Sequence, residues 1–398
     1  MHHPRSWTSH RVPAIAGALV LLVVELVLVH SAIAVAAVGG ITEYAVPTPN
    51  SQPMGIAGGP DGNLWFIEAN PNKVTKVTTS GGFTEYSIPT ANNGPNDIVR
   101  GPDGNLWFTE YGDRVGKVTT SGVITEYTGL DPASGLIGIA AGPDGNVWVD
   151  ESLANKVARV TISGVFTEYS IPTANSTPED ITGGPDGNLW LTEFVGNKIA
   201  KLTTAGVFTE YSVPTASSDP AYITEGPDGN LWFTEVNVNK VANVTTAGVF
   251  TEYTIPTSNS GPLDITAGPD GNLWFIEGSS NKVARVTTSG TFTEYSVPSA
   301  GSGPDITAGP DGNVWFTEYT ADKVAMVVSG ARSASAQSAP GSPPPRDPAA
   351  QSAPSTPRPR VPAVRSVPAT PVYESTPNAR RALGTAWRPM NGCLSARS

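Results

Sequence analysis

Histidine and cysteine are almost absent from this sequence of 398 residues. All four histidines lie within the first 30 residues, and the one cysteine is Cys393. A single cysteine excludes an intrachain disulfide framework and a cysteine-based zinc cluster. Because no histidine follows residue 30, the rest of the chain lacks the commonest acid–base side chain, which excludes a Ser-His-Asp triad and a histidine-ligated metal there.

Basic residues are scarce outside the C-terminal segment. Residues 37–330 contain 13 Lys and Arg against 32 Asp and Glu, whereas residues 331–398 contain nine Arg and two acidic residues. An acidic main body argues against nucleic acid as a partner, since nucleic-acid binding requires a cationic face. The basic segment is rich in Pro, Ser and Ala without any period, which predicts a disordered tail.

The first 36 residues have the pattern of an export signal. Two arginines precede an apolar run at residues 14–29, and Ala34 and Ala36 each end a small-x-small cleavage motif. We predict that residues 1–36 are a signal peptide. The alternative is a membrane anchor, because residues 14–38 are long enough to span a bilayer. Either interpretation predicts a secreted or extracytoplasmic protein.

One sequence unit recurs seven times in the main body. A Thr-Glu-Tyr motif marks every unit, and a period of about 42 residues without a helical pattern predicts a propeller of four-stranded blades. The second marker is the pentapeptide Gly-Pro-Asp-Gly-Asn, which begins at Gly59, Gly101, Gly142, Gly184, Gly226, Gly268 and Gly309.

The second unit illustrates the four strands. Pro102 presets the first central position of a turn, and Gly104 can supply the positive φ that closes a hairpin. The segments around this turn are rich in aromatic and β-branched residues or alternate in polarity, as strands do. The predicted strands are residues 97–100, 106–110, 115–119 and 123–127.

The order of the motifs predicts how the ring closes. Residues 41–46 carry a fourth-strand motif alone, and the last unit ends after a third strand at residues 324–328. The first strand is therefore expected to complete the last blade, which leaves no free edge between the chain ends. We predict an all-β, seven-bladed β-propeller of four-stranded antiparallel blades over residues 37–330, closed by the N-terminal strand, with a disordered C-terminal tail at residues 331–398.

Each unit has one tryptophan in its second strand. A stacking platform for sugars or bases is one interpretation. We favour packing between blades, because the tryptophan falls at the same place in every unit and large aromatics dominate β cores. The seven residues are Trp65, Trp107, Trp148, Trp190, Trp232, Trp274 and Trp315.

Residues 226–235, Gly-Pro-Asp-Gly-Asn-Leu-Trp-Phe-Thr-Glu, are a clear copy of the unit, and this unit resembles that of the streptogramin B lyases, also called virginiamycin B lyases. The resemblance covers all seven units. It implies a seven-bladed propeller and, in active members, Mg²⁺-assisted opening of a cyclic depsipeptide antibiotic by elimination at an ester bond.

The resemblance also implies where catalytic residues lie. The general acid/base glutamate of the family falls three residues after the tryptophan, which makes Glu193, Glu235 and Glu277 the candidate catalytic residues. The essential histidines fall two residues before a recurring isoleucine, and no unit here has histidine at that position. The alternative role for the glutamates is a cross-strand ion pair with a basic residue five positions on, such as Lys198 or Lys282.

Acidic residues cluster where the innermost strands are expected to begin. An oxygen-only set without histidine suits Mg²⁺ or Ca²⁺, with Asp180 and Asp264 as candidate metal ligands. The alternative is that the aspartates accept backbone hydrogen bonds at the strand starts. The residues predicted to line the channel mouth and contact a ligand are Asp97, Glu179, Asp180, Tyr222, Asp264 and Asp305.

Three functions are consistent with these patterns. The first is an exported streptogramin-lyase-like propeller, monomeric, that binds a small molecule or peptide at the channel mouth and lacks the family's catalytic histidines. The second is an enzyme, either a Mg²⁺-dependent C–O lyase of the virginiamycin B lyase type or a metal-dependent lactonase-like hydrolase. The third is a structural module of the cell envelope with the tail as a spacer. We favour the first, because the histidine position is empty in all seven units.

Overall fold

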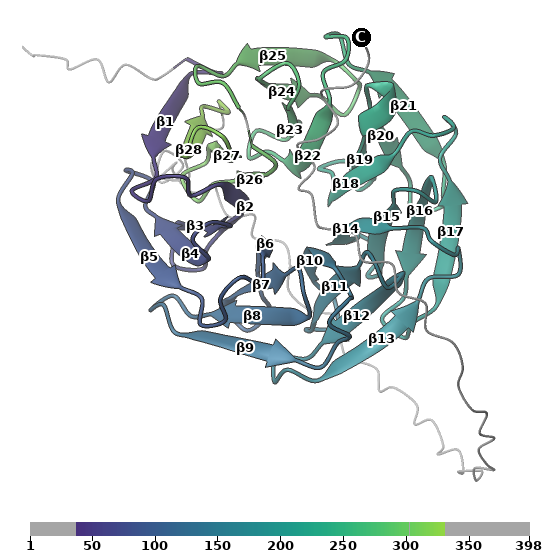
Figure 1. Ribbon diagram of the computed structural model, residues 1–398. Coiled ribbons are helices and arrows are strands. Elements are labelled where there is room, and N and C mark those ends of the chain that lie inside the picture. Colours follow the sequence, from purple (N-terminus) through teal and green to yellow (C-terminus); the bar gives the residue numbers. More distant parts are fainter. Residues whose placement is uncertain (1–36, 302, 331–398) are drawn as a thin grey trace, which may run out of the picture. The chain divides into compact units, whose positions relative to one another are not determined.

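The computed structural model describes residues 37–301 and 303–330, which form seven four-stranded antiparallel sheets around a central channel (Figure 1). This confirms the predicted all-β, seven-bladed propeller. The single helical element among the described residues is one 3₁₀ turn, η1 (Val236–Val238).

Each blade runs from an inner strand at the channel to an outer strand at the rim (Figure 1). Blade 1 contains β2 (Pro53–Gly58), β3 (Leu64–Glu68), β4 (Lys73–Val77) and β5 (Phe83–Ser87). Blade 2 contains β6 (Pro95–Arg100), β7 (Leu106–Glu110), β8 (Arg114–Val118) and β9 (Ile124–Thr128). Blade 3 contains β10 (Leu136–Ala141), β11 (Val147–Glu151), β12 (Lys156–Val160) and β13 (Phe166–Ser170). Blade 4 contains β14 (Pro178–Gly183), β15 (Leu189–Glu193), β16 (Lys198–Leu202) and β17 (Phe208–Ser212).

The remaining three blades repeat this order. Blade 5 contains β18 (Pro220–Glu225), β19 (Leu231–Glu235), β20 (Lys240–Val244) and β21 (Phe250–Thr254). Blade 6 contains β22 (Pro262–Ala267), β23 (Leu273–Glu277), β24 (Lys282–Val286) and β25 (Phe292–Ser296). Blade 7 contains β26 (Ile306–Ala308), β27 (Val314–Glu318), β28 (Lys323–Val327) and, as its outer strand, β1 (Ile41–Ala45).

Blade 7 joins the two ends of the described chain. β1 pairs antiparallel with β28 over all five residues of each strand. Tyr44 of β1 stacks on Trp315 of β27, with ring centroids 5.4 Å apart. The predicted closure is confirmed, and pairing both strands in one sheet removes the free edge.

The hydrophobic core lies between neighbouring blades. Trp65 on one face of blade 1 packs with Ile98 and Phe108 on the facing side of blade 2, and all three are buried. The blade tyrosines pack in the same interfaces: Tyr86 stacks on Trp65 and lies against Gly122 of blade 2, where a Cβ would overlap its ring. The seven tryptophans are fully buried, so they form the inter-blade core and not a stacking platform.

The pentapeptide turn also serves the core. In blade 2 the amide of Gly101 donates to the carbonyl of Asn105 at 2.8 Å, and Gly104 has a φ of +74°. The Asp103 carboxylate accepts a hydrogen bond from the buried Trp107 indole N–H at 3.0 Å. This bond recurs in all seven blades, so the motif satisfies the polar atom of each core tryptophan.

Two sequence predictions lie outside the described residues: the signal peptide or anchor at residues 1–36 and the disordered tail at residues 331–398. Within the described residues, no helix has the length and apolar character needed to cross a bilayer.

Candidate functional site at the channel mouth

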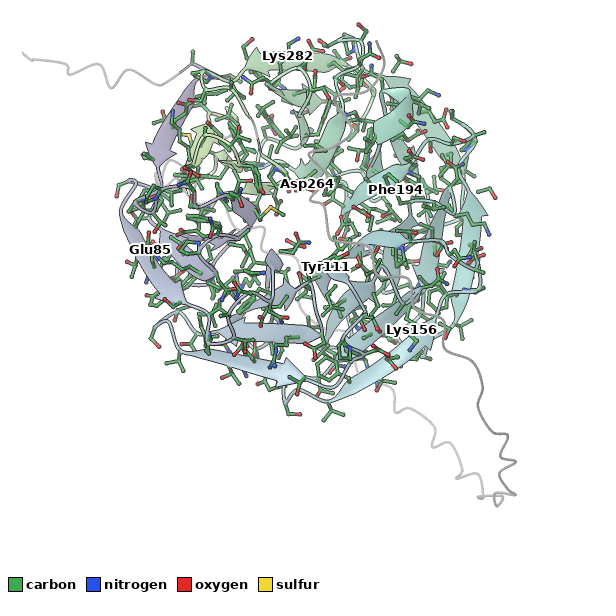
Figure 2. All side chains as sticks on the ribbon, in the orientation of Figure 1. Glu85, Tyr111, Lys156, Phe194, Asp264 and Lys282 are labelled. Carbon is green, nitrogen blue, oxygen red and sulfur yellow. The ribbon has the colours of Figure 1, made fainter. Side chains whose placement is uncertain are left out.

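A cavity of about 1280 Å³ opens where the inner strands begin. Its wall is built from the starts of the inner strands and from the turns that follow the second strands. Figure 2 shows Tyr111 and Asp264 beside the central opening, whereas Glu85, Lys156 and Lys282 lie at the periphery. The structure brings together all six predicted mouth residues, Asp97, Glu179, Asp180, Tyr222, Asp264 and Asp305.

The aspartates at the mouth link neighbouring blades. Each of the first six inner strands bulges just before its isoleucine, and such a bulge interrupts the ladder and leaves amides unpaired. Asp180 accepts a hydrogen bond from the amide of Ile181 in its own strand at 2.8 Å, through Oδ1. Its Oδ2 accepts one from the amide of Ile223 in the next blade, also at 2.8 Å.

The other three aspartates make the same two-blade connection. Together the four carboxylates accept a hydrogen bond from the inner isoleucine amide of every blade. The acceptors and their donors are Asp97 with Ile98 and Ile139, Asp264 with Ile265 and Ile306, and Asp305 with Ile306 and Ile56.

This connection explains why only four units carry aspartate. Because one carboxylate spans two blades, aspartate in alternate blades is sufficient. An odd number of blades then requires one adjacent pair, which is Asp264 and Asp305 in blades 6 and 7. The three blades without this aspartate have Gly55, Gly138 and Tyr222 directly before the inner isoleucine. The sequence-based alternative, backbone hydrogen bonding at the strand starts, describes these contacts correctly but does not specify the partner in the next blade.

The four aspartate carboxyl groups at the mouth have raised pKa values. Burial raises the pKa of all four aspartates, and repulsion from neighbouring carboxylates adds to the effect. Burial raises the pKa of Asp264 to about 7, and hydrogen bonding from Asp305 partly offsets this rise. Burial also raises the pKa of Asp305, and the neighbouring Asp264 carboxylate adds to the rise. The ring is therefore less negative at neutral pH than its formal charge.

Sequence reasoning missed Asp150 of β11. Its carboxylate is fully buried and accepts hydrogen bonds from the amides of Ile137 at 3.3 Å and Gly138 at 3.1 Å. A Cβ on Gly138 would lie 2.6 Å from Asp150 Oδ2, so the carboxylate can occupy this place only because residue 138 is glycine. The sequence did contain a signal for Asp150, because it is the one acidic residue at this position of the repeat. The other units have Ile67, Thr109, Thr192, Thr234, Ile276 and Thr317 there.

Glu179 differs from the aspartates. Its side chain lines the cavity with only 6% of the residue exposed. Among the residues that the structure describes, none makes a hydrogen bond or an ion pair with its carboxylate. Burial raises its pKa to about 7. Its charge in turn raises the pKa of two phenols beside it, those of Tyr111 and Tyr222, in each case after burial itself.

The hydrogen bonds of the aspartate oxygens bear on the predicted Mg²⁺ or Ca²⁺ site. Each carboxylate of Asp180 and Asp264 already accepts two backbone hydrogen bonds. Over residues 37–301 and 303–330, no group of three or more His, Cys, Asp or Glu side chains has an arrangement that could hold a metal ion. The side chains shown here therefore do not form a ready-made Mg²⁺ or Ca²⁺ site, and the metal assignment stays a prediction.

The three candidate catalytic glutamates lie elsewhere. Glu193, Glu235 and Glu277 end their second strands fully buried, and none is among the residues lining the mouth cavity. Burial raises the pKa of Glu193 to about 8, and the neighbouring Glu210 carboxylate adds to this. Burial likewise raises the pKa values of Glu235 and Glu277 to about 7. Their catalytic role stays a prediction.

The alternative role proposed for these glutamates is corrected by the structure. Lys198 lies opposite Glu193 in the strand register but forms its ion pair with Glu210 of the Thr-Glu-Tyr motif, at 2.8 Å. Lys282 likewise pairs with Glu294 at 2.7 Å. The reason is desolvation: Lys198 remains a quarter exposed beside Glu210, whereas pairing with the buried glutamate would require burying the ammonium group.

We expect the inter-blade aspartates to stabilise the ring. Asp180→Ala leaves two buried amides without an acceptor, at about 1–3 kcal/mol each, so urea unfolding should show a loss of about 2–6 kcal/mol. Asp180→Asn keeps one acceptor oxygen and should lose about half as much. Glu225→Ala, at the exposed end of β18, is the matched control. An Asp180→Ala variant as stable as that control would show that these hydrogen bonds contribute nothing.

The described residues form a seven-bladed β-propeller with a cavity at one mouth of its channel. A family model described as the virginiamycin B lyase family matches residues 29–221 and 172–342, and the chain belongs to that family. None of the curated proteins matches the sequence.

Solved structures agree with the assignment. A streptogramin B lyase is 36% identical, with 72% of this chain and 96% of that one covered and a TM-score of 0.69. Virginiamycin B lyase from Staphylococcus aureus is 34% identical, with coverages of 73% and 99% and a TM-score of 0.70. A catalytically inactive histidine-to-alanine variant of the same S. aureus enzyme, solved with quinupristin, is 35% identical with the same coverages and TM-score.

Proposed function

We propose that this protein is a binding member of its family, which takes a small molecule or peptide in the mouth cavity and does not linearise streptogramin B antibiotics. One observation carries the proposal. The position that the family resemblance assigns to essential histidines, two residues before each inner isoleucine, holds no histidine in any blade. The residues there are Met54, Asn96, Ile137, Glu179, Ala221, Leu263 and Pro304.

The location of these residues supports the proposal. Six of the seven line the mouth cavity, so the replacements change its wall directly. The S. aureus relative is described as catalytically inactive when one histidine is changed to alanine. A family member without histidine in its propeller is expected to lack the same step, while its cavity of about 1280 Å³ is large enough for a ligand.

The competing function is enzymatic: a Mg²⁺-dependent C–O lyase, or a metal-dependent lactonase-like hydrolase. Family membership and the carboxyl groups at the mouth favour it. A positioned base exists in principle, because Glu179 titrates near neutral pH. A cationic group that would stabilise developing negative charge is missing from the wall, since none of the described residues lining the cavity is Lys, Arg or His.

The placement of the protein outside the cytoplasm is also proposed. It rests on the sequence of residues 1–36, which predicts export with cleavage or anchoring. We propose that the propeller acts there as a monomer.

The expected result with quinupristin and Mg²⁺ is no ring opening at a rate near that of the S. aureus enzyme. Loss of a general acid or base typically lowers rate about 10²–10⁴-fold, and loss of a charge-stabilising group lowers it a further 10²–10³-fold or so. Mass spectrometry of the antibiotic measures the opening. The S. aureus enzyme is the positive control, and its inactive histidine variant sets the background.

Rapid opening would overturn the proposal. If that activity were then lost in Glu193→Gln, Glu235→Gln or Glu277→Gln, it would establish the catalytic role predicted from the sequence. Activity lost on removal of Mg²⁺ would establish the metal requirement as well.

A further inference from the structure

The mouth cavity has an unusual charge composition. Five carboxyl groups belong to its wall, and none of the described residues lining it is Lys, Arg or His. Four of the five are the aspartates that hold the inner strands together, so their oxygens already have backbone donors. The fifth, Glu179, has no such donor among the described residues.

Glu179 is a buried carboxylate without a partner in the described structure. Taking such a group out of water costs several kcal/mol unless a cation or hydrogen-bond donors compensate. None of the described side chains supplies that compensation, although the group faces a space that a ligand can enter. A ligand that brings its own positive charge would be stabilised at this point.

The surroundings of Glu179 suit an organic cation better than a metal ion. Tyr111 and Tyr222 line the same cavity as Glu179. Burial raises the pKa of both phenols, and the charge of Glu179 adds to the rise. Aromatic faces attract ammonium groups, and the attraction grows when water is excluded. The rim adds apolar surface: Leu153 is 63% exposed and lines the cavity, as does Leu263.

We propose that the cavity selects a small amphipathic amine, with its ammonium group against the Glu179 carboxylate and its apolar part against Tyr111, Tyr222 and Leu153. This inference rests on the proposed binding function and adds the chemical class of the ligand. A metal ion needs several oxygen ligands at once, whereas one carboxylate with aromatic neighbours is sufficient for an ammonium group.

Three probes of one shape test the selection: 2-phenylethylammonium, 2-phenylethanol and phenylacetate, titrated into the full chain by calorimetry at pH 8. Glu179 is ionised at that pH, since its pKa is about 7. The ammonium probe is expected to bind about tenfold or more tightly than phenylacetate, with the alcohol in between. Glu179→Gln should lower the affinity for the ammonium probe about tenfold and leave that for the alcohol unchanged.

Two controls keep the result specific. Glu225→Gln removes one carboxylate at the other end of a neighbouring inner strand and should not change the affinity for any probe. Glu179→Asp keeps the charge and should retain part of the preference, and thermal unfolding of each variant verifies the fold.

The outcomes separate this inference from the function it rests on. Equal binding of the three probes would overturn the selection for an amine and leave the binding function standing. Binding of none would also overturn the inference, and the binding function would then be decided by titrating unopened quinupristin. A preference for the ammonium probe that survives Glu179→Gln would place the cation elsewhere and overturn the assignment to Glu179.

Discussion

Removal of β1 is expected to lower the melting temperature of the propeller. A chain that begins at Pro47 keeps every inner strand and the whole cavity wall, but blade 7 loses its outer strand. β28 then presents an unpaired edge, and the apolar surface that Tyr44 and Val46 cover becomes open to water.

β1 and the residue after it interact with several parts of the ring. Tyr44 stacks on Trp315, and buried Val46 packs in the core between blades 7 and 1. Glu43 forms an ion pair with Lys323 at 2.6 Å and accepts a hydrogen bond from the amide of Ser299 at 2.7 Å. Burial of two large apolar side chains alone contributes about 3–6 kcal/mol, so removing the strand is expected to cost on the order of 5 kcal/mol or more.

Thermal unfolding followed by circular dichroism measures the effect. The matched control is a chain that begins at Ala37, which retains β1. A graded variant, Tyr44→Ala in the intact chain, removes a half-buried ring and should lose about 2 kcal/mol without opening the ring. If the chain beginning at Pro47 melted at the same temperature as the one beginning at Ala37, closure by β1 would not be what holds the ring.

The architecture was predictable because the same sequence unit recurs seven times. A period of 41 or 42 residues, four strand-like segments per unit and a displaced first strand together determine blade number and closure. The role of Trp107 followed from its fixed position. The role of Asp103 as acceptor for the Trp107 indole did not, because a turn motif explains that residue equally well without a partner.

The site was predictable in composition but not in its contacts. The acids of the mouth stand out wherever one unit departs from the others, and all six predicted residues meet at one cavity. The sequence of a single unit does not say that Asp180 reaches Ile223 in the next blade, or that Asp150 on a second strand replaces an aspartate missing at Gly138. Both are contacts between separately repeated elements, which a pattern within one repeat does not specify.

The ionisation of buried carboxyl groups predicts a second large effect: the free energy of unfolding should fall as pH rises from about 5 to 8.5. A carboxyl group whose pKa is raised on folding binds its proton more tightly in the folded state. Its contribution is fully present below the unfolded pKa, near 4.5 for Glu, and is lost as pH rises through the folded value. The strand-end glutamates have pKa values raised to about 8 in Glu110, Glu193 and Glu318 and to about 7 in Glu235 and Glu277.

The ion-paired glutamates act in a different pH window. Hydrogen bonding and attraction from Lys198 hold the pKa of Glu210 below its ordinary value despite burial. Stability from such a group is lost only as pH falls below the ordinary range of glutamate. Between pH 5 and 8.5 the buried acids therefore determine the slope, and the aspartates of the channel ring, also raised, add to it in the same direction.

Glu193→Gln isolates one of these contributions. Glutamine cannot ionise, so the variant should lose less stability between pH 5 and 8.5 than the unchanged protein. The difference expected from the raised pKa of Glu193 is on the order of 4 kcal/mol, at about 1.4 kcal/mol per pKa unit. Urea unfolding at the two pH values measures the difference, with exposed Glu225→Gln as the control whose slope matches that of the unchanged protein. A wild-type stability that is constant or rises over this range would contradict the neutral state of the buried glutamates, as would a Glu193→Gln variant with an unaltered slope. Because Glu193 lies outside the mouth cavity, its substitution should not alter binding of the ammonium probe, which separates this stability effect from the role of Glu179.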